Sequence, residues 1–110
     1  MTREEAIGEI TRRLVEFYHP HRIYLFGSVA RGESGPDSDL DFLVVMPDDT
    51  PKELMRASAL SLLRDIREAV DVIPWRVTDF DGRAAYVLAS LPATVVREGK
   101  LLYDARRVPA

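Results

Sequence analysis

The sequence contains no cysteine among its 110 residues. This absence excludes disulfide bonds, thiolate zinc sites and cysteine nucleophiles, and it is compatible with a reducing compartment. Long apolar runs are also missing, because none approaches the ~18 residues that a membrane-spanning helix requires. The N-terminal segment MTREEAIGEI is charged and lacks the apolar core of a signal peptide. We therefore expect a cytoplasmic protein that has no membrane partner.

An excess of positive charge is missing as well. The formal net charge is -3 at pH 7, whereas domains that coat nucleic acid usually carry a basic excess that displaces counterions. We therefore expect no direct nucleic-acid binding. A composition that is 46% hydrophobic and 30% charged is typical of a globular chain, and the length suffices for one compact domain with a single core.

Helical signals recur along the chain. Thr2 and Glu5 have the form of a capping box, which places the start of the first helix. Thr50 followed by Pro51 predicts the N-cap and first residue of a second long helix. Apolar spacing then predicts helices over residues 3–18, 51–68, 80–90 and 93–98.

Short apolar runs between these helices predict strands over residues 22–26, 39–46, 69–77 and 101–103. Pro74 indicates that the third strand ends at a sheet edge. The order of elements predicts an α/β domain, a small mixed β-sheet flanked by helices. We expect this domain to span residues 1–104, followed by a loose C-terminal tail at 105–110.

Three of the six glycines fall in one stretch, FGSVARGESGPDSDLDFLVV (26–45), which ends in the most apolar strand. Gly27 would let the backbone approach an anion closely, and Ser28 would add a hydroxyl and begin a turn with free N–H groups. Arg31 is placed either to face a phosphate or to brace the loop. The stretch therefore predicts a phosphate-binding loop.

Two aspartates at the start of that strand predict a metal site. Asp39 and Asp41 would point to the same face, and their charges would repel each other unless a cation lay between them. Asp71 would complete a cluster of three carboxylates if its strand lay beside residues 39–46. Such a cluster can hold two Mg²⁺ ions about 4 Å apart, as in two-metal phosphoryl chemistry.

Each of these features also has an ordinary explanation. An aspartate pair beside a turn is usually solvent-facing, and a Gly-Ser pair after a strand is usually just a turn. Asp71 could be a charge that protects an edge strand from pairing with another sheet. The functional interpretation is favoured because it explains all three features at once.

The arrangement resembles a known family. Gly27-Ser28, followed after ten residues by Asp39-x-Asp41, resembles the signature of the nucleotidyltransferase superfamily related to DNA polymerase beta, and in particular its minimal nucleotidyltransferase (MNT) branch. The resemblance implies the polymerase beta-like fold, ATP or another nucleoside triphosphate as substrate, Mg²⁺ as cofactor, and release of pyrophosphate. By this resemblance Gly27 and Ser28 match the phosphate-binding positions, Asp39 and Asp41 the metal ligands, and Asp71 a third carboxylate that helps to activate the acceptor hydroxyl.

Minimal members of this kind resemble the antitoxin half of toxin–antitoxin pairs whose partner is a helical HEPN ribonuclease toxin. The resemblance implies AMPylation, in which AMP from ATP is transferred to a tyrosine of the toxin and neutralises it. Larger members add a domain that grips the acceptor, and this chain ends soon after its last expected strand. We therefore expect the partner to supply the acceptor surface.

Two alternatives stay open at this point. The first is a non-catalytic nucleotide-binding antitoxin that acts by direct contact, and the second is a small-molecule nucleotidyltransferase of the antibiotic-modifying type. Exposed apolar side chains near four positions are candidates for a docking face, although core packing would also explain most of them. These positions are Trp75, Phe80, Tyr86 and Leu91.

Overall fold

A computed structural model of the chain describes residues 1–27, 29–32, 35 and 39–107. Its centre is a four-stranded sheet with the strand order β3-β2-β1-β4. Strand β1 is antiparallel to both β2 and β4, whereas β2 and β3 are parallel, so the expected mixed sheet is confirmed. The strands are β1 (Arg22–Phe26), β2 (Leu40–Met46), β3 (Val70–Arg76) and β4 (Lys100–Asp104).

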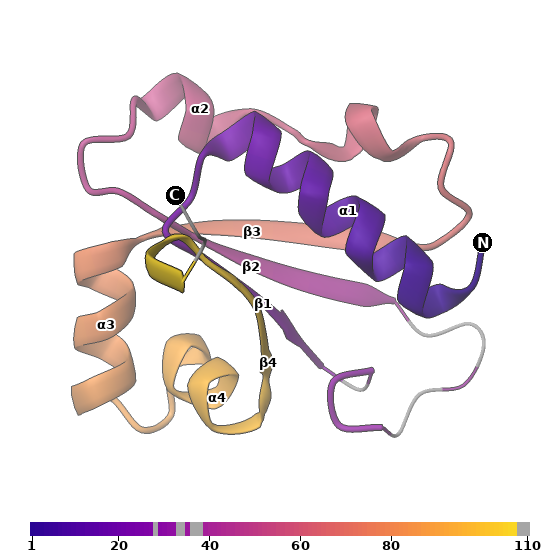
Figure 1. Cartoon of the computed structure of the whole chain (residues 1–110). Helices are drawn as coiled ribbons and strands as arrows, with labels where there is room; N and C mark the ends of the chain where they lie inside the picture. The colour runs from indigo at the N-terminus through magenta and orange to yellow at the C-terminus, as the bar shows by residue number, and fades with distance from the viewer. Residues whose placement is uncertain (28, 33–34, 36–38, 108–110) are drawn as a thin grey trace.

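Helices cover both faces of the sheet (Figure 1). One face packs against α1 (Arg3–Tyr18), and with it α2 (Lys52–Arg56) and the 3-10 helix η1 (Leu60–Leu63). The other face packs against α3 (Val77–Tyr86) and α4 (Leu91–Glu98). In Figure 1 these last two helices lie toward the end of β2.

The central strand β2 explains how one sheet supports two cores. Phe42 and Val44 belong to the cluster under α1, whereas Leu43 and Val45 join Phe80 in the cluster under α3 and α4. Successive side chains on a strand point to opposite faces, so a strand that is buried on both sides reads as a continuous apolar run. Asp41 has the same parity as Leu43 and therefore lies on the α3/α4 face.

The first helix is confirmed with its predicted cap. The Glu5 amide donates to Thr2 Oγ1 at 3.1 Å, and the Thr2 amide donates to Glu5 Oε1 at 2.9 Å. The helix then buries Ala6, Ile10 and Leu14 against the sheet at a spacing of four residues. Local sequence and tertiary packing agree here.

The prediction of one long helix over residues 51–68 is wrong. The chain forms α2, leaves helical geometry at Ala57, where ψ is 140°, and then forms η1. Thr50 is not the N-cap either, because its hydroxyl donates to the Pro47 carbonyl at 2.7 Å. Arg13 of α1 explains part of the break, since it donates to the Leu62 carbonyl at 2.8 Å and holds the end of η1. Contacts with α1 thus override the helical periodicity.

The remaining boundaries differ by small amounts. Asp39 precedes β2 rather than opening it, α3 begins at Val77, and α4 begins at Leu91 with Ser90 as its N-cap. Strand β3 lies at an edge of the sheet, as Pro74 indicates. Residues 105–107 form a short 3-10 turn whose first amide, that of Ala105, donates to the His21 carbonyl at 2.9 Å, so this part of the expected tail is fixed to the sheet.

No helix within the described ranges is long and apolar enough to span a membrane.

Candidate active site

Two aspartates from neighbouring strands lie side by side at the start of β2. Asp41 of β2 is the register partner of Asp71 of β3, and paired residues on parallel strands lie about 5 Å apart at their backbones. Val70 and Val72 pack against the cluster under α1, so Asp71 between them points to the opposite face, which is also the face of Asp41. The expected neighbourhood of Asp71 and residues 39–46 is therefore confirmed.

The charges of both other aspartates act on the Asp41 carboxylate. Its pKa is raised above the ordinary value, first by burial, then by the charge of Asp71 and then by that of Asp39. Asp41 is half-buried, whereas Asp39 and Asp71 are exposed. Repulsion of this kind destabilises a site that holds no cation and favours one that holds a divalent ion.

Gly27 packs directly against this carboxylate. Its φ is +82°, a left-handed conformation that L side chains adopt only at a cost. A Cβ at this position would collide with Asp41 Oδ2 and would lie 3.5 Å from its Cγ. Glycine is thus required twice, once for the backbone and once for the close approach. The predicted phosphate-binding corner and the predicted metal ligand are neighbours in space.

Arg31 and Ser28 are the other two residues of the predicted phosphate-binding loop. The Arg31 amide donates to the Gly27 carbonyl at 3.3 Å, which closes a turn immediately after Gly27. Ser28 lies outside the described residues.

The donor set at this site is suited to magnesium, which binds one or two carboxylates and takes its remaining ligands from water and substrate phosphates. Three carboxylates within electrostatic reach of one another match this hard-cation chemistry. Within the described part of the chain, however, no three His, Asp or Glu side chains are arranged so that they could hold a metal ion together. An ion here would therefore depend on ligands from the nucleotide as well as from the protein.

Arg3 is a residue near the site that sequence reasoning missed. Its Nη1 donates to the Gly35 carbonyl at 3.2 Å, and its Nη2 donates to Glu68 Oε2 at 3.2 Å. Gly35 lies in the chain that leads to Asp39, and Glu68 lies just before β3, which carries Asp71. Arg3 therefore links the two segments that bring the acidic side chains together. No local sequence pattern predicts these contacts, because the partners of Arg3 are 32 and 65 residues away in the sequence.

The four candidate docking residues separate into two groups. Phe80 is fully buried, and Trp75 and Leu91 pack against the same cluster, so these three belong to the core. Tyr86 is 88% exposed, and the nearby Leu88 is 79% exposed. Of the four candidates, Tyr86 at the end of α3 thus retains the exposed apolar character that a docking face would need.

Comparison with known proteins relates most of the chain to one domain family. A family model described as a nucleotidyltransferase domain matches residues 7–93. A search of curated proteins found no match.

Solved structures share the fold at low sequence identity. A toxin-antitoxin with AMP-PNP matches with a TM-score of 0.52 and 23% identity, covering 91% of this chain and 75% of that one. A protein of Sulfolobus solfataricus assigned as a nucleotidyltransferase matches with a TM-score of 0.59 and 21% identity, covering 96% and 84%. A mutant of the toxin-antitoxin MntA-HpeT matches with a TM-score of 0.57 and 20% identity, covering 91% and 75%.

Proposed function

The chain belongs to the nucleotidyltransferase domain family, and on that premise we propose that it is an antitoxin that transfers AMP from ATP to a tyrosine of a HEPN-type toxin. The observation that supports this most strongly is the pairing of Asp41 with Asp71 beside Gly27. Folding alone gains nothing from like charges on adjacent strands, because burial and then these charges raise the pKa of Asp41. A site built for a cation and a phosphate explains them.

In this proposal each aspartate has its own role. Asp39 and Asp41 would hold Mg²⁺, and Asp71 would accept the proton of the acceptor hydroxyl. The bound magnesium would supply charge stabilisation at the transferring phosphoryl group. Asp71 is exposed on the edge strand β3, where an acceptor side chain could approach it.

The glycine corner would hold the triphosphate. Gly27 allows the backbone to come within contact distance of the Asp41 carboxylate, so phosphate oxygens bound at this corner and a cation bound by Asp41 would be neighbours. Ser28 would add its hydroxyl and Arg31 its positive charge. The reaction would form a bond between the tyrosine oxygen and the α-phosphorus and would release pyrophosphate.

The toxin partner is supported by similarity. Two of the solved structures that share this fold are toxin-antitoxins, and one of them was solved with AMP-PNP, an analogue of ATP. The exposed Tyr86 and Leu88 offer an apolar surface that a protein partner could cover.

Co-expression with the cognate toxin tests the proposal. We expect wild-type protein to add the mass of one or more AMP groups to the toxin, localised to tyrosine by peptide mass spectrometry. The double variant Asp39→Asn with Asp41→Asn should add none, because both proposed metal ligands are neutral. Asp79→Asn on exposed α3 is the matched control and should behave like the wild type.

The alternatives predict other outcomes. A toxin that the double variant neutralises fully without any added mass would point to inhibition by contact and would overturn the transfer. If the wild-type protein neither neutralises nor modifies the toxin but transfers AMP to an added aminoglycoside, the chain is a small-molecule enzyme.

A further inference from the structure

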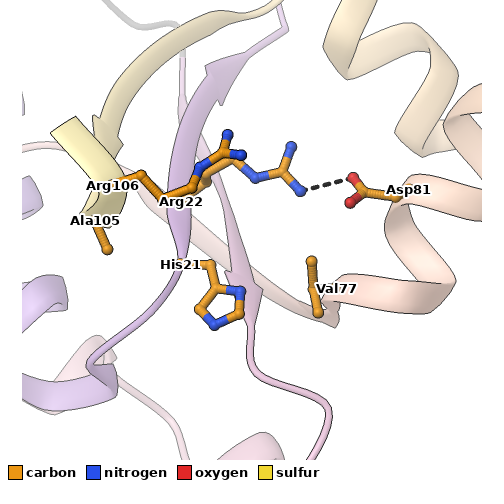
Figure 2. Close-up of a pocket in the computed structure, with 6 residues that line it drawn as sticks. All are labelled: His21, Arg22, Val77, Asp81, Ala105 and Arg106. Carbon is orange, nitrogen blue, oxygen red and sulfur yellow. Dashed lines mark hydrogen bonds and ion pairs between the residues drawn. The ribbon is translucent and has the colours of Figure 1, made fainter.

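A cavity of about 230 Å³ lies at the opposite end of the sheet from Asp41 (Figure 2). Arg22 at this end of β1 pairs with Val45, whereas Phe26 at the other end pairs with Asp41. The volume is below the roughly 300–1,000 Å³ typical of pockets for drug-sized ligands, so it suits a small one. The lining residues are His21, Arg22, Val77, Asp81, Ala105 and Arg106.

Arg22 presents unused hydrogen-bond donors to this cavity. Its side chain is only 15% exposed, and it donates to Tyr24 Oη at 3.0 Å and to Asp81 Oδ1 at 2.6 Å. A guanidinium has five N–H donors, so these two bonds leave others free. Among the residues that the structure describes, no buried side-chain nitrogen or oxygen lacks a partner. Arg22 lines the cavity, so the donors that these two bonds leave over are the ones that a bound anion would use.

Arg106 brings a second guanidinium to the same place. Its Nε and Nη2 donate to the buried Asp104 at 3.3 and 3.2 Å, while the side chain itself is 82% exposed. Asp104 raises the pKa of Arg106 most strongly, and the nearby charge of Arg22 opposes that rise. Figure 2 shows the two arginine side chains close together on the side of the cavity that faces Asp81.

Three further titratable side chains lie in or near the cavity. Asp81 lines it from α3, is 56% exposed and forms its ion pair with Arg22. His21 lines it from the position just before β1, and its charge acts on Asp48. Asp104 lies behind Arg106 and is already bonded to it. The cavity thus contains two guanidiniums and, among its lining residues, the single carboxylate of Asp81.

We propose that this cavity binds a phosphate-sized anion between Arg22 and Arg106, with the exposed Asp81 carboxylate moving aside. The planar donor forks of two arginines match the oxygens of a phosphoryl group, which charge-assisted hydrogen bonds hold more strongly than neutral ones. The ligand is inorganic phosphate or the phosphoryl group of a small phosphomonoester. The inference is independent of the proposed AMP transfer, because it involves neither Gly27 nor the three aspartates.

An NMR titration tests the proposal directly. Inorganic phosphate is added to ¹⁵N-labelled wild-type protein without magnesium, at constant ionic strength maintained with chloride. We expect saturable shifts of the His21, Arg22, Ala105 and Arg106 amides. A second arm uses AMP, and shifts at the same amides identify a phosphomonoester as a ligand, whereas a response to phosphate alone restricts the site to the free anion. Linear, unsaturable shifts in both arms, or shifts confined to Gly27 and Asp41, overturn the proposal.

Adjacent arginines provide a matched pair of variants. Arg106→Ala should weaken phosphate binding about tenfold or more, because charge-assisted bonds are lost. Arg107→Ala removes the same charge from the same turn and also pairs with Asp104, but it lines a different surface depression, so its effect should stay below about twofold. Asp81→Asn removes the competing carboxylate and should tighten binding several-fold. Equal weakening by Arg106→Ala and Arg107→Ala, or weaker binding in Asp81→Asn, would contradict the site.

Discussion

Two aspartates at opposite ends of the sheet have opposite environments. Asp41, at the start of β2, has a raised pKa because it is partly buried beside Asp71 and Asp39. Asp104, at the end of β4, has a lowered pKa because the side chain and backbone amide of Arg106, and then the charge of Arg107, favour its ionised form. The neighbours of Asp41 therefore disfavour its ionised form, whereas the neighbours of Asp104 favour it.

The difference shows where the chain trades stability for function. At the Asp104 end, Asp104 and Asp81 each have an arginine partner, as ordinary folding favours. At the Asp41 end the backbone of Gly27 comes close, and the neighbouring charges are negative. Concentrated like charge of this kind is typical of sites that act on a ligand of the other sign.

The largest expected effect comes from filling the space beside Asp41. Gly27→Ala should reduce the proposed AMP transfer about a hundredfold, because displacing a reacting group by about 1 Å can cost that much. Its free energy of unfolding should also fall by about 1–2 kcal/mol through the left-handed backbone. Turnover assays and urea denaturation measure the two effects.

Gly32 supplies the control for this change. Its φ is +74°, but an added Cβ would meet no atom within 4 Å. Gly32→Ala should therefore lose similar stability and keep most of the activity. Equal losses of activity in both variants would show that backbone strain, not contact with Asp41, governs the site.

A smaller effect is expected on the pH dependence of stability, which should differ in sign between Asp41 and Asp104. Because the folded-state pKa of Asp41 is raised, its ionisation costs stability as pH rises through that value, so Asp41→Asn should be more stable than the wild type at pH 7. The pKa of Asp104 is lowered, so its contribution is present above the unfolded value of about 3.9 and is lost as pH falls below it. Asp104→Asn should therefore be less stable at pH 7.

Denaturation of the three proteins at pH 7 and pH 3 checks this sign. Both differences from the wild type should shrink at pH 3, where the carboxyl groups of the unfolded chain are protonated. A loss of stability in Asp41→Asn at pH 7 would mean that Asp41 has a favourable partner and that the carboxylate end is not strained.

The smallest effect concerns the link through Arg3. Arg3→Gln removes the ion pair with Glu68 and should lower the unfolding free energy by only about 0.5 kcal/mol, as for other partly exposed pairs. Transfer activity should fall further than that of Arg12→Gln, which removes only pairs within α1. Identical activity in the two variants would exclude a positioning role for Arg3.

Much of the fold was predictable where local and tertiary preferences agree. The capping box of α1, the strand at 22–26 and the apolar run of β2 all lie close to the predicted positions. The segment after Pro51 was not predictable, because contacts of Arg13 with Leu62 and Asp65 favour a broken helix over a continuous one. The apolar periodicity identified the residues that face the core there, but it did not predict the break between α2 and η1.

For the site, the residue types and the place of Asp71 beside residues 39–46 were predictable, whereas the other contacts were not. Gly27, Asp39, Asp41 and Asp71 follow from spacing and from the family resemblance. The contact between Gly27 and Asp41 and the link through Arg3 depend on segments that only the folded sheet brings together. The roles of Ser28, Arg31 and the aspartates in binding and catalysis stay predictions.

By itself, the sequence determined that this is a small α/β domain with a glycine corner and acidic residues at a strand start, because backbone conformation and side-chain alternation are local properties. Only the tertiary structure decided which charges meet. The parallel pairing of β2 with β3 places Asp71 beside Asp41, and the return of the chain in β4 places Arg106 beside Arg22. Electrostatic energy depends on distance in space, and sequence separation carries little information about that distance.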